Sequence, residues 1–216
     1  MIAVIDCETT GTNVYSSEII TLFGIAVDKN LNELGTIDFR SQPLNWGHGA
    51  EQVHKITRQE ASQYPLFKDC YIDLINWFKA YQVTEIWCHA NPLMFGKITY
   101  FDYTLLRMQM SYQDDASYWL INSIRPYSTH TLASLHLELE KLDLKTICDN
   151  LGIQLKHHNA ESDARAALEI MRRLPVNTED IDKKLRGYDD TSNAIESDPI
   201  KPTKKRRTTK RVSVSL

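Results

Sequence analysis

The chain has 216 residues, of which 28 are acidic and 25 are basic, and its formal net charge is −3 at pH 7. This length suits one domain with an ordinary core, and no apolar run approaches the length of a bilayer span, so we expect no membrane-spanning helix. The first residues lack a basic region followed by a long apolar stretch and a cleavage site, so we expect no secretory signal and a soluble, cytoplasmic protein.

Three apolar segments near the start predict three consecutive strands. Residues 2–6 form the first, and residues 18–28 are almost continuously apolar, as in a buried central strand. Residues 34–40 alternate between apolar and polar side chains, and a polar turn separates them from the second segment. We therefore expect a meander in which the second and third strands pair antiparallel.

Helical and extended patterns then alternate along the chain. The spacing of apolar side chains predicts helices over 66–81, 101–110, 142–152 and 161–174, and a strand over 83–90. A glycine at the end of the third of these helices, Gly152, is a suitable C-cap. This order predicts an α/β fold built on a sheet of mixed direction.

The composition changes near residue 177. Residues 200–216 hold seven basic side chains and no acid, whereas residues 1–199 hold 18 basic and 28 acidic side chains, a net charge of −10. We expect a folded domain over 1–176 and a polar, mostly disordered tail over 177–216. The basic cluster fits an additional nucleic-acid contact, a nuclear-import signal or a solvated tail, and the sequence does not choose among them.

Cysteine usage bears on the kind of metal site that the chain can form. The four cysteines lie far apart and include no C-x-x-C pair, which argues against a zinc finger or a redox motif: Cys7, Cys70, Cys88 and Cys148. This usage favours buried thiols in a reducing compartment. A bound metal would therefore have oxygen ligands.

Asp6 and Glu8 stand one residue apart at the end of the first predicted strand. Because side chains alternate along a strand, both carboxylates would share one face, with Cys7 on the other. Two like charges side by side are tolerable when a proton or a cation lies between them, and a divalent metal is the usual cation for oxygen ligands. In the alternative interpretation the strand ends at Ile5 and both acids are solvated in a turn.

Two further acids lie near the starts of predicted helices. Asp102 opens one helix, where an acid also suits the helix dipole. Asp163 would share a face with Ala166 and Ala167, and a charge on this core-facing side is costly unless it is paired or binds a metal. His158 precedes Asp163 by five residues, close enough to share one site.

The order of these motifs resembles the DnaQ-like, or DEDDh, 3′–5′ exonucleases of the ribonuclease H-like superfamily. The motifs are D-x-E at residues 6–8, F-D at 101–102 and H-x-x-x-x-D at 158–163, and TTG, VHKIT, THTL and LKTICDNLGI support them. The resemblance covers about residues 1–174. It implies a ribonuclease H-like mixed five-stranded sheet flanked by helices.

The resemblance also implies an activity and its cofactors. Two divalent ions, Mg²⁺ or Mn²⁺, would be held by four acids: Asp6, Glu8, Asp102 and Asp163. His158 would act as the general base on the attacking water. The reaction would release nucleoside 5′-monophosphates one at a time from the 3′ end of single-stranded DNA or RNA, with DNA favoured.

Substrate contacts follow from the same resemblance. Thr9, Thr10 and His54 would lie near the terminal nucleotide. The family often has V-H-G-I-T where this chain has VHKIT, so Lys55 replaces a glycine and leaves the role of His54 open. The sequence does not identify a protein partner.

The second acid motif departs from the family pattern. Eleven positions separate Asn91 from Asp102, where the family usually has only a few. Either residues 92–99 are an insertion, or the second acid is Asp114 or Asp115, which lie in a polar stretch more typical of a loop. We assign the role to Asp102.

Three other functions compete with this interpretation. An RNA-trimming exoribonuclease would share the same motifs, because no residue reports contact with a 2′-hydroxyl. A haloacid dehalogenase-like phosphatase also begins with D-x-[DE]-x-T, but it normally needs a second Asp where Glu8 stands and a later G-D-x-x-x-D segment that the sequence lacks. A catalytically inactive nucleic-acid-binding module would have little reason to retain four acids and a histidine.

Overall fold

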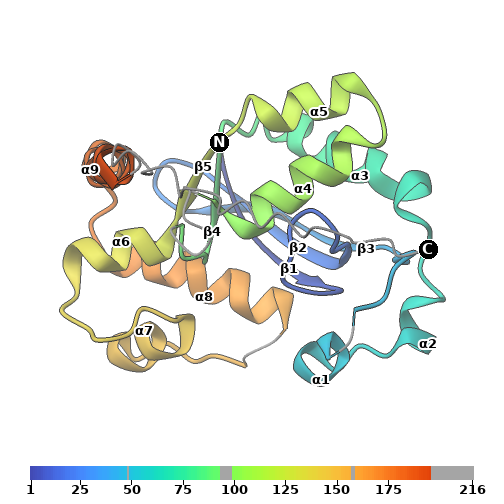
Figure 1. Cartoon of the computed structure of the whole chain (residues 1–216), viewed down its shortest axis with the longest axis horizontal. Helices are drawn as coiled ribbons and strands as arrows, with labels where there is room; N and C mark the ends of the chain where they lie inside the picture. The colour runs from blue at the N-terminus through green and yellow to red at the C-terminus, as the bar shows by residue number, and fades with distance from the viewer. Residues whose placement is uncertain (48, 93–98, 157–158, 196–216) are drawn as a thin grey trace, which may run out of the picture.

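The computed structural model describes residues 1–47, 49–92, 99–156 and 159–195, and side chains through residue 187 (Figure 1). Five strands form one sheet in the order β3-β2-β1-β4-β5, and their bounds are β1 (Ile2–Thr9), β2 (Ile19–Val27), β3 (Glu33–Arg40), β4 (Glu85–Cys88) and β5 (Arg125–Ser128). The first three strands pair antiparallel, whereas β1, β4 and β5 run parallel. The predicted meander and mixed sheet are confirmed.

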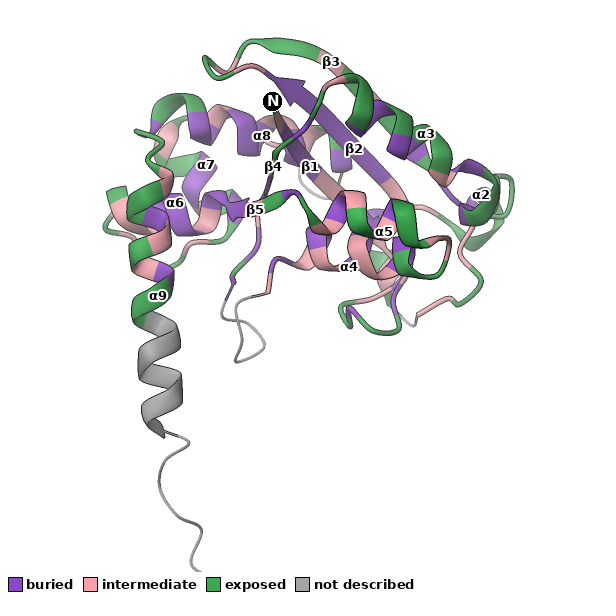
Figure 2. Ribbon diagram, turned by 90° about the horizontal axis from the view of Figure 1, so that it is seen from above, coloured by how far each residue is buried: buried purple, intermediate pink, exposed green. Residues whose placement is uncertain are grey.

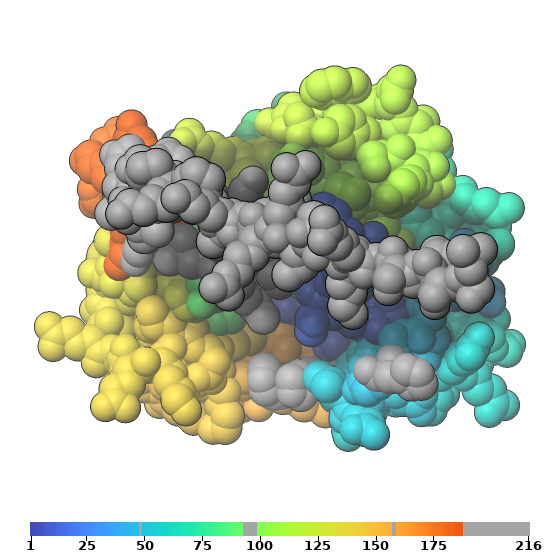
Figure 3. Space-filling model, in the orientation of Figure 1, coloured from blue at the N-terminus to red at the C-terminus, as the bar shows by residue number. Residues whose placement is uncertain are grey.

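Helices cover both faces of this sheet. They are α1 (Ala50–His54), α2 (Arg58–Ala61), α3 (Phe67–Ala80), α4 (Phe101–Ser111), α5 (Asp115–Asn122), α6 (Thr129–His136), α7 (Leu144–Leu151), α8 (Ala160–Arg173) and α9 (Thr178–Ile195). None of the helices in the described ranges is long and apolar enough to cross a membrane. Figure 3 shows N-terminal residues, in blue, at the surface between the green helices above and the yellow and orange helices below.

The pairing of β1 with β2 shows which helices pack on each face of the sheet. Ile5 is opposite Gly24, where a Cβ would lie 3.0 Å from the Trp77 ring, so this face packs against α3. Asp6 is opposite Phe23, whose ring lies under the Arg165 guanidinium of α8. The acids of β1 therefore face α8, as alternation along a strand requires.

The apolar stripe of α8 seals this second face (Figure 2). Ala164, Ala167 and Leu168 are buried, and α8 packs against β1 and β2. Small alanine side chains allow the helix to approach the sheet closely. Asn159 accepts a hydrogen bond from the Ser162 N–H at 3.1 Å and caps the helix, as expected of this residue type.

Several elements differ from the sequence-based expectations, and the short helices α1, α2 and α6 were not located from the sequence. The polar stretch around Asp114 and Asp115 begins helix α5, with Asp114 as its N-cap, instead of forming a loop. The short strand β5 was not located from the sequence. The segment from residue 178 is helical instead of disordered: α9 buries Ile181 and Leu185 and packs against α6, while residues 196–216 lie outside the described part of the chain.

Candidate active site

The carboxylates of β1 meet that of α8 at the carboxyl end of β1. Strand β1 continues through Thr9, so Asp6 and Glu8 are strand residues on one face, and the interpretation that places both in a turn is wrong. Asp163 reaches the same place from the first turn of α8, and one oxygen from each of the three carboxylates lies within 4.8 Å of the others. Hard carboxylate oxygens at this separation suit a divalent cation.

Asp102 joins the cluster from the N-terminus of α4. Its Oδ1 accepts a hydrogen bond from the Cys7 N–H at 3.1 Å, and the Cys88 thiol also hydrogen bonds to its carboxylate. Strand β4 stops pairing with β1 at Val4, so the Asp102 carboxylate takes a backbone donor that no neighbouring strand uses. The structure therefore brings Asp102 to the site despite the long segment that separates it from Asn91.

Burial and mutual repulsion oppose ionisation of these acids. Glu8, Asp102 and Asp163 are 9%, 5% and 6% exposed. Burial, followed by the charges of Asp102, Asp163 and Glu8, holds the pKa of Asp6 well above its usual value. Burial and the charges of Asp163 and Asp102 raise the pKa of Glu8 to about 7. Burial raises the pKa of Asp102 to about 6 against the opposing effect of backbone hydrogen bonds, including that from Cys7.

Three cavities open at the acid cluster. The central one, of about 300 Å³, is lined by all four acids together with Phe101 and His89. A smaller cavity of about 180 Å³ lies between Glu8 and His54. A third, of about 560 Å³, extends from Asp6 and Asp163 toward His89 and His130. The site is thus accessible from both sides of the carboxylates.

The structure describes some of the remaining predicted site residues and not others. His158 lies outside the described residues. The Thr9 hydroxyl donates to the Gly11 carbonyl at 2.7 Å, and the Thr10 hydroxyl accepts from the Glu18 N–H at 2.9 Å, so both hydroxyls hold the loop after β1. Their contact with a substrate stays a prediction.

His54 is buried at the end of α1, in the wall of the cavity beside Glu8. Its Nδ1 accepts a hydrogen bond from the Ile56 N–H at 3.0 Å, and its ring packs edge-on against Trp46 with centroids 6.3 Å apart. Lys55 adopts φ 65° and ψ 2°, the left-handed conformation that a glycine would take at this position. The turn after His54 is therefore formed even though this chain has Lys55 where the family often has glycine.

Replacing Lys55 by glycine is expected to raise the free energy of unfolding by about 1 kcal/mol. The left-handed conformation costs a residue with a Cβ roughly 1–2 kcal/mol, and the greater freedom of glycine in the unfolded chain offsets part of the gain. Urea denaturation of Lys55→Gly and Lys55→Ala checks this, because the alanine variant keeps the strain. A Lys55→Gly protein no more stable than Lys55→Ala would contradict the prediction.

Gly47 fixes how the segment before α1 meets the loop after β1. A Cβ at this position would lie 1.9 Å from the Thr10 carbonyl oxygen, a backbone atom that cannot rotate away. Gly47→Ala is expected to destabilise the protein by about 2 kcal/mol through overpacking. It should also displace the loop after β1 at Thr10, two residues beyond Glu8. Thermal unfolding measures the loss. Gly187→Ala, which meets open space in α9, is the matched control and should not destabilise the protein.

Sequence reasoning did not single out His89 as a site residue. It follows β4, and its ring nitrogens lie 2.9 Å from the Thr129 Oγ1 and 3.1 Å from the Leu142 carbonyl oxygen. The ring thereby joins three segments beside the acid cluster. Its position directly after a strand parallel to β1 was the available signal, because such strands end at the same edge of a sheet.

Comparisons with known proteins agree with this geometry. Residues 3–171 match the sequence model of the RNase_T family, described as exonuclease. No curated protein sequence matches the chain significantly. A solved structure of exonuclease I superposes with a TM-score of 0.65 at 18% identity, covering 87% of this chain and 43% of that one.

Two further solved structures give the same picture. Exonuclease I from Methylocaldum szegediense has a TM-score of 0.62 and 21% identity, and the match covers 79% of this chain and 39% of that one. Exonuclease I from E. coli, in complex with a dT13 oligonucleotide, has a TM-score of 0.65 and 18% identity over 86% and 43% of the two chains. At these sequence identities the structural similarity establishes only that the chain shares the fold of these proteins. The chain spans less than half the length of each of them.

Proposed function

The chain belongs to the RNase_T exonuclease family, DnaQ-like proteins of the ribonuclease H-like superfamily, and from this premise we propose that it is a metal-dependent 3′–5′ exonuclease. In this proposal it releases nucleoside 5′-monophosphates from the 3′ end of single-stranded nucleic acid, with DNA preferred to RNA. The convergence of Asp6, Glu8 and Asp163 within 4.8 Å carries the proposal. Such a cluster is costly in a buried position without a cation.

The four acids would hold two divalent ions, Mg²⁺ or Mn²⁺. Bound there, the ions would supply positive charge to the attacking and leaving oxygens of the phosphodiester. The chain's own contribution is to hold the carboxylates on rigid elements: Asp6 and Glu8 on a central strand, and Asp102 and Asp163 in the first turns of two helices. Phe101 and His54 line the adjoining space and would orient the terminal nucleotide.

His158 is the proposed general base. Asn159 caps α8, and Asp163 lies four residues further along in the first turn. The sequence therefore attaches His158 directly to the helix that presents Asp163. A neutral histidine side chain is a common general base near neutral pH, so His158 would take the proton from the attacking water.

The substrate proposal draws on a neighbour of the same fold. Exonuclease I from E. coli has been solved with a single-stranded oligonucleotide bound, which favours single-stranded DNA as the substrate here. The seven basic residues in positions 200–216 would add salt-sensitive contacts with phosphates. We propose that this tail compensates for the acidic charge of the rest of the chain.

Digestion of 5′-labelled single-stranded DNA and RNA of matched sequence tests the function. With Mg²⁺, we expect a ladder that shortens from the 3′ end, faster on DNA, and no cleavage with EDTA. Asp6→Ala and Asp102→Ala should lose the activity, while Asp73→Ala, an exposed acid on α3 that lines none of the three cavities at the acid cluster, should retain it. Faster digestion of RNA would reverse the substrate preference. No cleavage of either strand would overturn the enzyme assignment and leave a binding module.

A further inference from the structure

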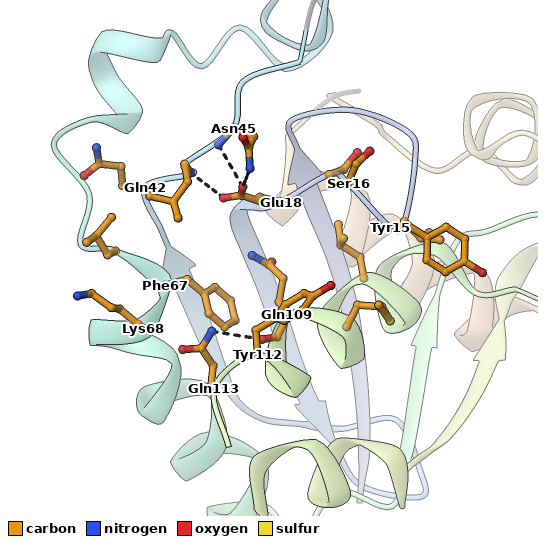
Figure 4. A pocket seen from close by; sticks show the side chains of 16 residues that line it. Tyr15, Ser16, Glu18, Gln42, Asn45, Phe67, Lys68, Gln109, Tyr112 and Gln113 are labelled. Carbon is orange, nitrogen blue, oxygen red and sulfur yellow. Dashed lines mark hydrogen bonds between the residues drawn. The ribbon is translucent and has the colours of Figure 1, made fainter. Parts of the chain in front are cut away.

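The largest cavity described in the molecule lies outside the acid cluster. It has a volume of about 630 Å³, within the range of sites that hold a small ligand. Its walls come from the loop between β1 and β2, the segment after β3, the start of α3 and the end of α4 (Figure 4). None of the four acids lines it, so this space is separate from the candidate active site.

Aromatic and apolar side chains form much of the wall. Phe67 from α3 and Tyr112, the C-cap residue after α4, both line the cavity, and Leu105 closes it from within the core. Tyr112 is 71% exposed, so most of its ring is available to a ligand. Figure 4 shows Tyr112 beside Gln109, whereas Tyr15 projects away at the edge. A planar ligand could stack on the Tyr112 ring.

The polar groups of the cavity are mostly amides. Gln109 lies on α4 and Gln113 in the turn that follows it, and Gln42 and Asn45 come from the segment after β3. Within the described residues the Gln42 side chain makes no hydrogen bond that would occupy it, whereas the Gln109 Oε1 accepts from the Ile19 N–H at 2.9 Å. Side-chain amides both donate and accept, and this combination matches the edges of nucleobases.

The charge of the cavity also suits a nucleotide. Its one acid, Glu18, is already satisfied by the N–H groups of Leu44 and Asn45 and by the Asn45 side-chain amide, at 2.7, 3.1 and 2.7 Å. Lys68 lies at the opposite side and forms no salt bridge with any described residue. An accessible ammonium group in an otherwise acidic body would attract a phosphate.

One short loop separates this cavity from the acids. Thr12 lines the central cavity of the acid site, and Val14 to Glu18 line the larger one. The loop is closed at its base by the hydrogen bond from the Thr10 N–H to the Glu18 carbonyl at 2.9 Å, and Gln109 anchors the following residue of β2. A strand that enters the acid site could therefore cross this loop and place an upstream base in the cavity.

We infer that the cavity between α3, α4 and the β1–β2 loop binds a nucleobase of the substrate strand, upstream of the nucleotide being removed. The inference rests on the proposed exonuclease function and adds a second contact point for the strand. Tyr112 stacks on the base, the amides of Gln42 and Gln109 contact its edge, and Lys68 meets a neighbouring phosphate. The enzyme would then prefer strands long enough to reach this cavity.

An abasic scan tests this inference. Oligonucleotides of about twelve residues, of the strand type that the wild type degrades, carry one abasic analogue at successive positions from the 3′ end. The value of kcat/KM for removal of the 3′-terminal nucleotide is measured for the wild type, Tyr112→Ala, Tyr112→Phe and Trp119→Ala. Trp119 is the matched control, an exposed aromatic residue on α5 that does not line the cavity.

At one upstream position, loss of the base should lower kcat/KM of the wild type about tenfold and should have a much smaller effect in Tyr112→Ala, because the stacking partner is already absent and only the amide contacts remain. Tyr112→Phe keeps the ring and should behave as the wild type, as should Trp119→Ala. An abasic profile identical in the wild type and Tyr112→Ala would overturn the inference.

Absence of cleavage would instead refute the proposed function. The affinity of the wild type and of Tyr112→Ala for intact and abasic labelled oligonucleotides would then be measured in EDTA. A loss of affinity on removal of the base that is larger in the wild type would support the cavity as a base-binding site, and equal losses in both proteins would overturn it.

Discussion

Asp163→Asn is expected to lower kcat on a single-stranded substrate by at least about 10³-fold, while raising the stability of the metal-free protein. A metal in such a site supplies several kcal/mol of transition-state stabilisation, and about 4 kcal/mol corresponds to that factor. Asparagine has the same shape but no charge, so the cluster of Asp6, Glu8 and residue 163 would hold a divalent ion weakly. Removing the charge also relieves its repulsion of Glu8, whose pKa it helps to raise.

These opposite effects distinguish a metal ligand from a structural residue. Initial rates on labelled DNA give the loss of activity, and thermal unfolding in EDTA gives the stability. Glu169→Gln is a suitable control, because Glu169 lies on the same helix and pairs with Arg172 at the surface. It should change both quantities little. An Asp163→Asn enzyme with near wild-type rates would exclude Asp163 from the catalytic site.

The metal-free protein is expected to lose stability as the pH rises from about 5 to 8. In the folded state burial and the neighbouring carboxylates raise the pKa of Glu8 from its ordinary value of 4.5 to about 7, and burial raises the pKa of Asp102 to about 6. Between the unfolded and folded pKa values the folded state binds more protons, so the free energy of unfolding falls with rising pH. Glu8 alone would account for roughly 3 kcal/mol at most.

Divalent ions should remove this pH dependence. At pH 8 Glu8 and Asp102 are mostly charged, and Mg²⁺ or Mn²⁺ would take the place of their protons, so saturating metal should raise the melting temperature more at pH 8 than at pH 5. Urea denaturation from pH 5 to 8, in EDTA and in Mn²⁺, measures both effects. Glu8→Gln should show a shallower decline in EDTA. A flat profile for the wild type in EDTA would contradict the prediction.

The sequence predicted those elements whose apolar side chains are regularly spaced. Strands β1 to β4 and helices α3, α4, α7 and α8 were predicted from the sequence, and Gly152 ends α7 in the left-handed conformation expected of a C-cap. Strand β5 has only four residues and includes Pro126, so no alternating pattern identifies it. In α9 only Ile181 and Leu185, four residues apart, indicate a packed face within a polar segment.

The candidate site was predictable to different degrees for each acid. The alternation of a strand places Asp6 and Glu8 together, and the buried face of α8 identifies Asp163 from its apolar neighbours. Asp102 could not be fixed by spacing, because the chain between β4 and α4 is longer than the family pattern allows. Only the folded arrangement, in which Asp102 accepts the Cys7 N–H, ties it to the cluster.

The hydrogen bond from Cys7 makes one backbone N–H group a reporter of the charge on Asp102. The Cys7 amide proton points at the Asp102 carboxylate, and it lies between Asp6 and Glu8 in the sequence. Its amide resonance in a ¹H–¹⁵N spectrum would shift when Asp102 takes up a proton or a metal ion, without any label attached to the site. Occupancy of the carboxylate cluster could therefore be titrated in the intact protein, independently of substrate and of turnover.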